Sequence, residues 1–249
     1  MITDEAVVDV SQDWLQACSV QERLMRAPAP VNRRLEYSVS CRQLRALGGD
    51  CYDFTWLPDG RLAFLIGDAS GKGVAAALMM AGVQASLRTA SLFTGDDLPA
   101  LLHAVNRQVC FSSPTGRYAT LFCGVLDPVT RTLRYVNAGH NPPLVLHPDG
   151  SCDWLDPTGA PVGLFPDGIW QEKAVRLRPG DRLVAYTDGV TETFSPAGDE
   201  WGADRLQQTA RDHASKSPDV MVRSILDAMS CFSAGVQSDD VTLAVIQAL

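Results

Sequence analysis

The sequence predicts an α+β fold, an antiparallel β-sandwich of two sheets flanked by helices. Short apolar, β-branched runs are joined by turn signals such as Pro58-Asp59-Gly60 and Pro148-Asp149-Gly150, which is typical of hairpins. Strands and helices come in blocks and do not alternate strictly, which disfavours a parallel sheet. The chain has 249 residues, 46% of them hydrophobic, which is enough to bury the core of one large domain.

Residues 1–30 are predicted to form a helical segment that precedes the domain. Apolar residues recur along it, among them Trp14, Leu15 and Leu24, and Ala27-Pro28-Ala29-Pro30 is a helix-terminating linker signal. We interpret residues 1–30 as a helical appendage and residues 31–249 as the folded domain.

The first half of the domain is predicted to contain a hairpin followed by two helices. Strand-like alternation covers residues 35–41, 51–57 and 61–67, and Pro58-Asp59-Gly60 joins the last two. Residues 73–91 are rich in helix formers and carry an apolar face, with Val74, Leu78 and Ala81 on it. A second helix of similar length is expected over 96–112.

The second half returns to strands and ends on one. Apolar runs bounded by turn residues predict strands over 119–127, 132–139, 143–147, 173–178 and 181–189. Two helical stretches, about 202–213 and 218–232, precede a last strand at 241–249. The hairpin spacings favour antiparallel pairing throughout.

Charge and cysteine usage exclude several classes of protein. The net charge is −8, with 29 acidic against 21 basic residues and no Lys/Arg block, so a nucleic-acid partner is not expected. Neither a signal peptide nor a membrane-spanning run is evident, which predicts a cytoplasmic protein. Seven scattered cysteines without a C-x-x-C pair predict reduced thiols and argue against disulfides or a zinc site.

Aspartates gather where apolar strands end or begin. Asp68 follows one strand, Asp188 follows another, and Asp239 with Asp240 precedes the last. If these strands are neighbours, the carboxylates converge at one edge, and divalent cations such as Mg²⁺ or Mn²⁺ would relieve their repulsion. Taken singly, Asp188-Gly189 is more often a turn, and Asp50 or Asp239 a cap. Several such residues at strand ends together favour a metal site.

Two other motifs are weaker. Residues 67–73, Gly-Asp-Ala-Ser-Gly-Lys-Gly, resemble a P-loop, but only three residues separate Gly67 from Gly71, and Gly73 follows Lys72 where a P-loop has Ser or Thr. His140 lies between a strand and a diproline with no Ser or Cys nucleophile signature, so we interpret it as structural.

The acidic segments, in their order, resemble the PPM (protein phosphatase 2C-like) family, in its bacterial SpoIIE/RsbU-type branch of serine/threonine phosphatases. The resemblance spans residues 31–249, and it is carried by residues 48–53, 67–73, 119–127, 138–143, 163–165, 177–192 and 239–243. It implies an αββα sandwich with two metal ions, Mn²⁺ or Mg²⁺, at one end. It also implies hydrolysis of phosphoserine or phosphothreonine on proteins by a metal-bridging hydroxide.

The resemblance assigns roles to individual positions. Asp68 is similar to the carboxylate that bridges both metals, and the backbone carbonyl of Ala69 to a further ligand. Asp188 and Asp239 are similar to ligands of one metal, and Asp50 to an acid that holds metal-bound waters. Two further acids, Asp53 and Asp240, lie nearby in the motifs without an assigned role.

Some family features are missing here. Many eukaryotic members carry a His shortly after the bridging Asp and a phosphate-binding Arg before the first acidic motif, whereas Ser70 and Lys72 follow Asp68. Protonation of the leaving group is therefore unassigned. Lys72, Arg42 and Arg45 are candidate phosphate contacts, although an isolated cation is more often a solvated surface charge.

The resemblance also implies partners. The usual substrate in this branch is a phosphorylated anti-anti-sigma protein of the STAS type, which predicts a part in signal transduction and sigma-factor regulation in the stress response. Residues 1–30 are expected to receive an upstream activator or to form a homodimer. A non-catalytic docking regulator on the same fold is the main alternative, and an unrelated small-molecule metallohydrolase ranks last.

Overall fold

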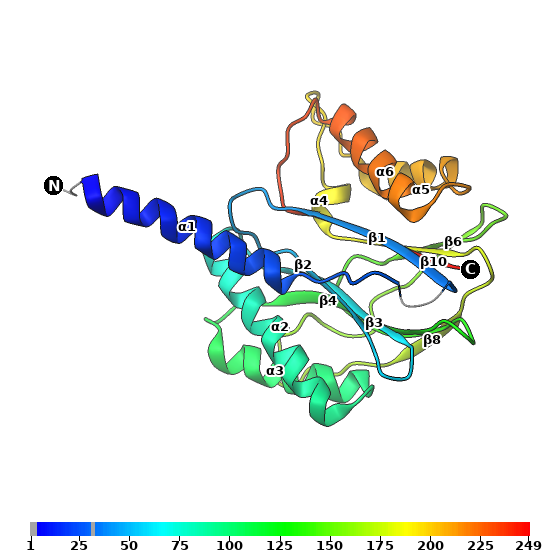
Figure 1. Ribbon diagram of the computed structural model, residues 1–249, viewed down its shortest axis with the longest axis horizontal. Coiled ribbons are helices and arrows are strands. Elements are labelled where there is room, and N and C mark those ends of the chain that lie inside the picture. Colours follow the sequence, from blue (N-terminus) through cyan, green and yellow to red (C-terminus); the bar gives the residue numbers. More distant parts are fainter. Residues whose placement is uncertain (1–3, 31–32) are drawn as a thin grey trace.

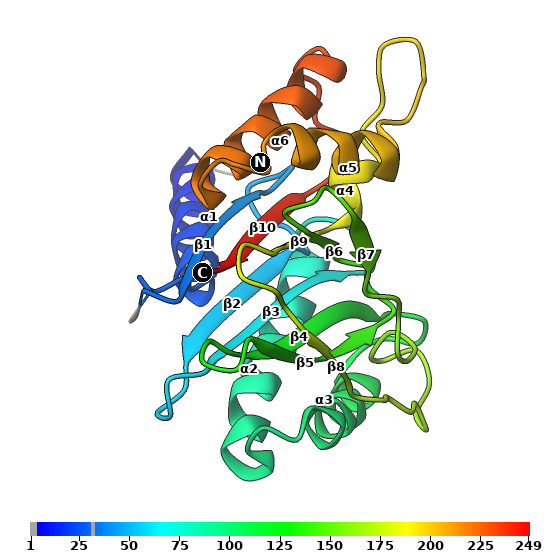
Figure 2. The ribbon, with the colours of Figure 1, turned by 90° about the vertical axis from the view of Figure 1, so that its right-hand side faces the viewer.

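Two antiparallel sheets of five strands face each other (Figures 1 and 2). The computed structural model describes residues 4–30 and 33–249. In the first sheet the spatial order is β1 (Leu35–Arg42), β10 (Val241–Ala248), β9 (Arg182–Tyr186), β6 (Leu144–Leu146) and β7 (Cys152–Trp154). In the second sheet it is β2 (Cys51–Trp56), β3 (Leu62–Ala69), β4 (Ala119–Asp127), β5 (Thr132–Ala138) and β8 (Lys173–Arg176).

Helices cover the outer face of each sheet, as predicted. The helices α2 (Val74–Thr94) and α3 (Leu98–Ser112) pack on the second sheet, and α5 (Gly202–Asp212) and α6 (Pro218–Phe232) pack on the first. The inner faces form a third apolar layer, in which Phe122 stacks on Tyr135 with ring centroids 5.3 Å apart. The sandwich therefore has three cores, and inner strands such as β4, β9 and β10 are buried on both faces.

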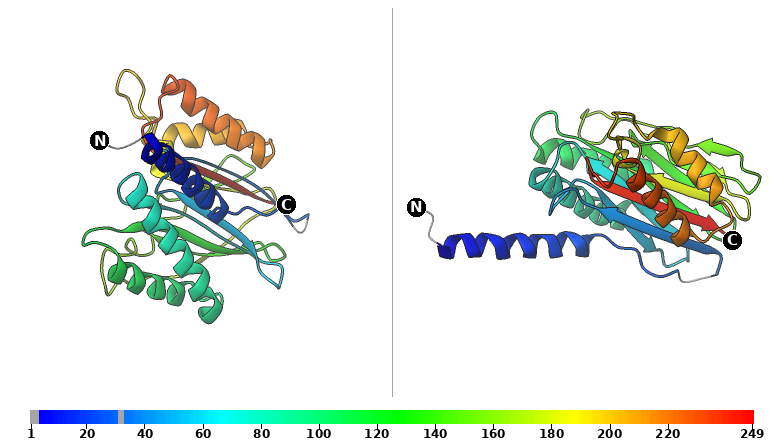
Figure 3. Two further views of the ribbon diagram at one scale, coloured as in Figure 1. Left: turned by 60° about the vertical axis from the view of Figure 1, so that its left-hand side comes forward. Right: turned by 90° about the horizontal axis from the view of Figure 1, so that it is seen from above.

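The first helix, α1 (Asp4–Leu24), projects from the sandwich (Figures 1 and 3). The prediction of helix to about residue 30 is too long. After Leu24 the chain extends, and the carbonyl of Arg26 accepts a hydrogen bond of 2.8 Å from the amide of Phe54 on β2. The prolines at 28 and 30 also disfavour continued helix. Residues 1–3 lie outside the described residues, and so do residues 31–32, at the predicted boundary between the appendage and the domain.

The other predicted strands and helices are confirmed within a few residues, and two short elements were missed. The strand β7 has three residues, too few to show a period, and it forms only because β6 offers a partner. The helix α4 (Asp188–Thr191) is a single turn where a strand end was expected. Within the described part of the chain, no helix has both the length and the apolar character needed to cross a membrane. All seven cysteines are free thiols.

Candidate metal centre

The Asp50 carboxylate connects the two sheets at one edge of the sandwich. Asp50 directly precedes β2 in the second sheet, yet its Oδ2 accepts hydrogen bonds from Thr187 Oγ1 at 2.7 Å and Thr242 Oγ1 at 2.6 Å, both on the first sheet. Asp50 is 1% exposed, and its other oxygen, Oδ1, has no hydrogen-bond partner. A buried carboxylate oxygen without a partner is costly unless a cation or a proton satisfies it.

A side-chain oxygen of Asp68 and the carbonyl oxygen of Ala69 both lie next to Gly49. Asp68 is the penultimate residue of β3, and a Cβ placed on Gly49 would stand 3.1 Å from Asp68 Oδ1 and 3.0 Å from the carbonyl oxygen of Ala69. The two oxygens therefore converge on the same side of Gly49, where the missing side chain leaves them room. These are the two oxygens to which the family resemblance assigns a role as metal ligands.

Asp188 and Asp239 are brought together by Gly189. The Cβ that Gly189 lacks would stand 1.9 Å from the carbonyl oxygen of Asp240 and 3.2 Å from Asp239 Cβ. The start of α4 therefore presses directly on the segment that precedes β10. A hydrogen bond of 3.0 Å from the Thr187 amide to the Thr242 carbonyl holds the same contact.

The carboxylates raise one another's pKa. Burial raises the pKa of Asp68 to about 9, and the charges of Asp50, Asp188, Asp239 and Asp240 add to the shift. Burial likewise raises the pKa of Asp50 to about 8, against the lowering effect of its two threonine hydrogen bonds. Burial and the charge of Asp239 raise the pKa of Asp188. The structure thus brings together four of the predicted metal-binding acids: Asp50, Asp68, Asp188 and Asp239.

The carboxylate and carbonyl oxygens of the cluster are the kind of ligand that a hard divalent cation prefers. One of these carboxylates, Asp239, is already in an ion pair. Among the described residues, no three His, Cys, Asp or Glu side chains are placed to hold one ion as they stand. Asp239 Oδ2 is turned to Lys72 Nζ at 2.6 Å, which also donates to the Ser238 carbonyl. An all-oxygen, mutually repelling and partly unsatisfied set matches Mg²⁺ or Mn²⁺. Lys72 thus competes with a cation for Asp239 Oδ2.

The two remaining acids have structural contacts. Asp240 accepts hydrogen bonds of 2.7 Å from the amides of Leu44 and Gly49, so it anchors the segment before β2. Asp53 points away from the cluster and forms an ion pair of 2.7 Å with Arg88 on α2. Asp240 therefore supports the cluster through the backbone, whereas the structure does not bring Asp53 to it.

The candidate phosphate contacts lie in different places. Lys72 is at the cluster, paired with Asp239. Arg45 lies over the Asp68 loop, with Nη1 3.2 Å from the position of a Cβ on Gly73. The Arg42 side chain is exposed at the end of β1. Sequence reasoning missed Arg117, an exposed residue whose Nη1 donates to the Ser70 carbonyl at 2.7 Å, two residues beyond Asp68.

Sequence reasoning also missed the two threonines that hold Asp50. Thr187 and Thr242 are both fully buried and stand inside the motifs that carry Asp188 and Asp240. A hydroxyl at a buried strand end beside an acid was the available signal. His140 has the structural place predicted for it, because its Nδ1 bonds Thr120 Oγ1 at 2.8 Å and burial lowers its pKa to about 4.

The raised pKa values predict a pH-dependent stability. Asp50 and Asp68 ionise near pH 4 in the unfolded chain and at about 8 and about 9 in the folded protein. Between these limits the folded state binds protons that the unfolded state releases, so stability falls as pH rises. With a chelator present, we expect the melting temperature to decline from about pH 5 to about pH 9.

This expectation is checked by thermal denaturation across that range. Adding Mn²⁺ should raise the melting temperature most at the alkaline end, where the carboxylates are charged. Asp68→Asn should make the decline shallower, whereas Asp227→Asn, which changes an exposed residue on α6, should leave it as it is. A decline of equal slope in Asp68→Asn and the unmodified chain would contradict the assignment.

The sequence of the chain is similar to a protein-family model and to several known proteins. Residues 58–249 match the family model described as Stage II sporulation protein E (SpoIIE). The chain is 28% identical over 253 residues to the protein IcfG of Synechocystis, covering 90% of this chain and 39% of IcfG. It is 26% identical over 232 residues to the phosphoserine phosphatase RsbU of Bacillus subtilis, covering 93% of this chain and 68% of RsbU.

The solved structures include a match over the whole chain. The SiaA-PP2C domain of Pseudomonas aeruginosa superposes with a TM-score of 0.85 at 19% identity, covering 99% of both chains. At this identity the likeness establishes the fold, and it confirms the predicted sandwich. The chain spans well under half of IcfG and about two thirds of RsbU, so those whole proteins contain sequence that has no counterpart in this chain.

Proposed function

The chain belongs to the SpoIIE family, and from this premise we propose that it is a metal-dependent protein serine/threonine phosphatase. Its active centre would be the carboxylate cluster around Asp68. The single observation that carries the proposal is the convergence of Asp68 Oδ1, the Ala69 carbonyl and the unpartnered Asp50 Oδ1 with Asp188 and Asp239 at one edge of the sandwich. RsbU, a relative across most of this chain, is named a phosphoserine phosphatase.

Two divalent cations, Mn²⁺ or Mg²⁺, would be held by Asp68 with the Ala69 carbonyl, by Asp188 and by Asp239, with Asp50 alongside. Cations in such a site supply a lowered pKa for water and neutralise charge on phosphoryl oxygens. The residues of the chain hold the site in shape. Thr187 and Thr242 orient Asp50, Gly189 sets the approach of Asp188 to Asp239, and Asp240 fixes the Gly49 backbone.

Cationic side chains around the cluster suit a phosphorylated substrate. Lys72 and Arg117 both carry donors beside the Asp68 loop, on a chain whose net charge is −8. Positive charge at these two positions would lessen the repulsion between a phosphate dianion and the carboxylates. Lys72, once released from Asp239, would contact the phosphoryl oxygens, and Arg117 would do so without leaving Ser70.

The substrate class is proposed from the family. We infer a phosphorylated regulatory protein, of the STAS type that serves as anti-anti-sigma factor, in the cytoplasm. The helix α1 would receive the activator or a second copy of the chain, since Trp14, Leu15 and Val20 on it are 42%, 71% and 60% exposed.

The test is hydrolysis of p-nitrophenyl phosphate by the full chain with Mn²⁺, Mg²⁺ or a chelator. We expect turnover with Mn²⁺ that the chelator removes. Turnover that survives the chelator would contradict the metal-dependent mechanism. Absence of turnover with every metal, on this ester and on a phosphorylated STAS protein, would favour the non-catalytic docking regulator.

A further inference from the structure

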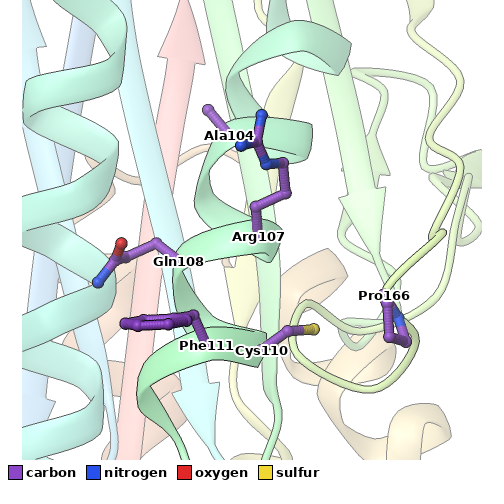
Figure 4. A pocket seen from close by; sticks show the side chains of 6 residues that line it. All are labelled: Ala104, Arg107, Gln108, Cys110, Phe111 and Pro166. Carbon is purple, nitrogen blue, oxygen red and sulfur yellow. The ribbon is translucent and has the colours of Figure 1, made fainter.

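An open groove of about 730 Å³ lies between α3 and the loop that carries Pro166 (Figure 4). Four of its lining residues recur at spacings of three and four along α3 and so share one helix face: Ala104, Arg107, Gln108 and Phe111. Cys110 and Pro166 line the remainder. The groove therefore has a helical wall and a loop wall.

The loop wall is held in place by buried contacts. Asn106 is 1% exposed; its Nδ2 donates to the carbonyls of Phe165 and Pro166 at 2.9 and 3.1 Å, and its Oδ1 accepts from the Gly163 amide at 2.7 Å. Farther along the loop, Trp170 packs edge-on against His103 of α3 with ring centroids 5.1 Å apart. A groove fixed in this way is formed before any ligand arrives, which lowers the entropic cost of binding.

Exposed apolar residues occur on α3 and on the loop that forms the other wall, and one basic side chain lines the groove. Phe111 is 89% exposed, and Phe165 and Ile169 on the loop are 56% and 73% exposed. Large exposed apolar side chains on both walls of a groove favour an interaction surface. Arg107, which lines the groove, is exposed, and the ion pairs of the described residues do not include it.

Backbone hydrogen bonds connect the groove loop to the candidate active centre. Ala119, at the start of β4, pairs with Ala69 of β3 on one side. On its other side it exchanges two hydrogen bonds of 2.9 Å with Val162, which directly precedes Gly163 of the groove loop. The C-terminal end of α3 also lies near the start of β4, because only residues 113–118 connect the two. The start of the groove loop and the C-terminal end of α3 therefore lie close to Ala69 and the candidate centre.

We propose that this groove, together with Arg107, docks the phosphorylated protein substrate beside the phosphorylated residue. The inference rests on the proposed phosphatase function and deepens it. The occupant is an extended segment of the substrate with an apolar side chain, which enters between Phe111 and Pro166. A carboxylate next to that side chain pairs with Arg107. The centre then recognises the phosphate, and the groove recognises the sequence around it.

The test uses the full chain with Mn²⁺ and a panel of synthetic phosphoserine peptides. Each peptide has an alanine-glycine background, and a Leu-Glu pair is moved stepwise away from the phosphoserine on either side. We expect one narrow range of spacings to lower KM about tenfold relative to the peptide without the pair. Phe111→Ser and Arg107→Gln should each remove most of that preference, measured against KM for p-nitrophenyl phosphate.

Matched controls change the same residue types elsewhere. Phe93→Ser alters an 84% exposed phenylalanine at the far end of α2, and Arg176→Gln alters an exposed arginine on β8; both should keep the preference. A panel without a preferred spacing, or a preference that survives both groove substitutions, overturns the docking proposal. A dimer seen by light scattering that dissociates in Phe111→Ser, with no peptide preference, assigns the groove to self-association and also overturns it.

The design separates this proposal from the proposed function. Loss of turnover on both the ester and all peptides would be a failure of the phosphatase assignment. Binding of peptides to the groove can then still be measured by fluorescence anisotropy, because fluorescein-labelled peptides report binding without turnover. Tighter binding of peptides within one narrow range of spacings, weakened by Phe111→Ser and Arg107→Gln, supports the groove, and equal binding of all peptides overturns it.

Discussion

Replacing Asp68 by Asn is expected to lower Mn²⁺-dependent hydrolysis of p-nitrophenyl phosphate by about 10³-fold or more. Burial raises the pKa of Asp68, and the charges of Asp50, Asp188, Asp239 and Asp240 add to the shift, so Asp68 lies in a strongly negative field. The amide has the shape of the acid but lacks its charge, and it would bind a divalent cation far more weakly. Steady-state kinetics and calorimetric titration with Mn²⁺ measure the two effects.

The same substitution should leave the fold intact and, in chelator at about pH 9, make it more stable than the unmodified chain. Asn removes a carboxylate whose ionisation is opposed by burial and by its neighbours, so the variant no longer pays that electrostatic cost at alkaline pH. Activity and stability thus move in opposite directions. Full activity in Asp68→Asn would remove Asp68 from the proposed centre, whatever the stability does.

Replacing Gly189 by Ala is expected to destabilise the protein by about 1–3 kcal/mol and to weaken Mn²⁺ binding. The added Cβ would meet the Asp240 carbonyl at 1.9 Å, and a backbone atom at the start of β10 cannot rotate away as a flexible side chain can. The contact separates α4 from the segment before β10, and with it Asp188 from Asp239. Urea denaturation and calorimetric titration with Mn²⁺ report the two outcomes.

A second glycine provides the control. Gly82 lies within α2, and a Cβ there would meet nothing within 4 Å. Because alanine is the better helix former, Gly82→Ala should stabilise the protein by about 0.5–1 kcal/mol and leave Mn²⁺ binding unchanged. If Gly189→Ala is as stable as the unmodified chain, the close approach of α4 to Asp240 is not needed to build the centre.

Local pattern was sufficient for most of the elements because side-chain period is a local property. The alternation in residues 61–67 and the helix formers in 73–91 correspond to β3 and α2, with shifts of one to three residues at the ends. Prediction from local pattern failed where an element depends on a partner far away in the sequence. The strand β7 needs β6 beside it, and the end of α1 at Leu24 depends on the pairing of Arg26 with β2.

The chemistry of the site could be read from residue types, whereas its assembly could not. Aspartates at strand ends indicated a metal centre, and the family resemblance assigned Asp68 and Asp188 to it. Asp68 lies near the end of β3 and Asp188 follows β9, and these strands belong to different sheets, so the two residues are not neighbours along one sheet edge as the convergence argument assumed. They meet because the sheets face each other and Asp50 spans the gap to Thr187 and Thr242.

Composition, periodicity and motif order were enough to determine the fold class, the order of the elements and the kind of residues at the centre, because each is encoded in short stretches of chain. The partners of the individual side chains required the folded chain. Asp53 pairs with Arg88, Asp240 binds amides near residue 44, and the α3 groove opens beside β4. These contacts join residues far apart in sequence, and the free energy of burial and electrostatics that selects them exists only once both sheets are packed.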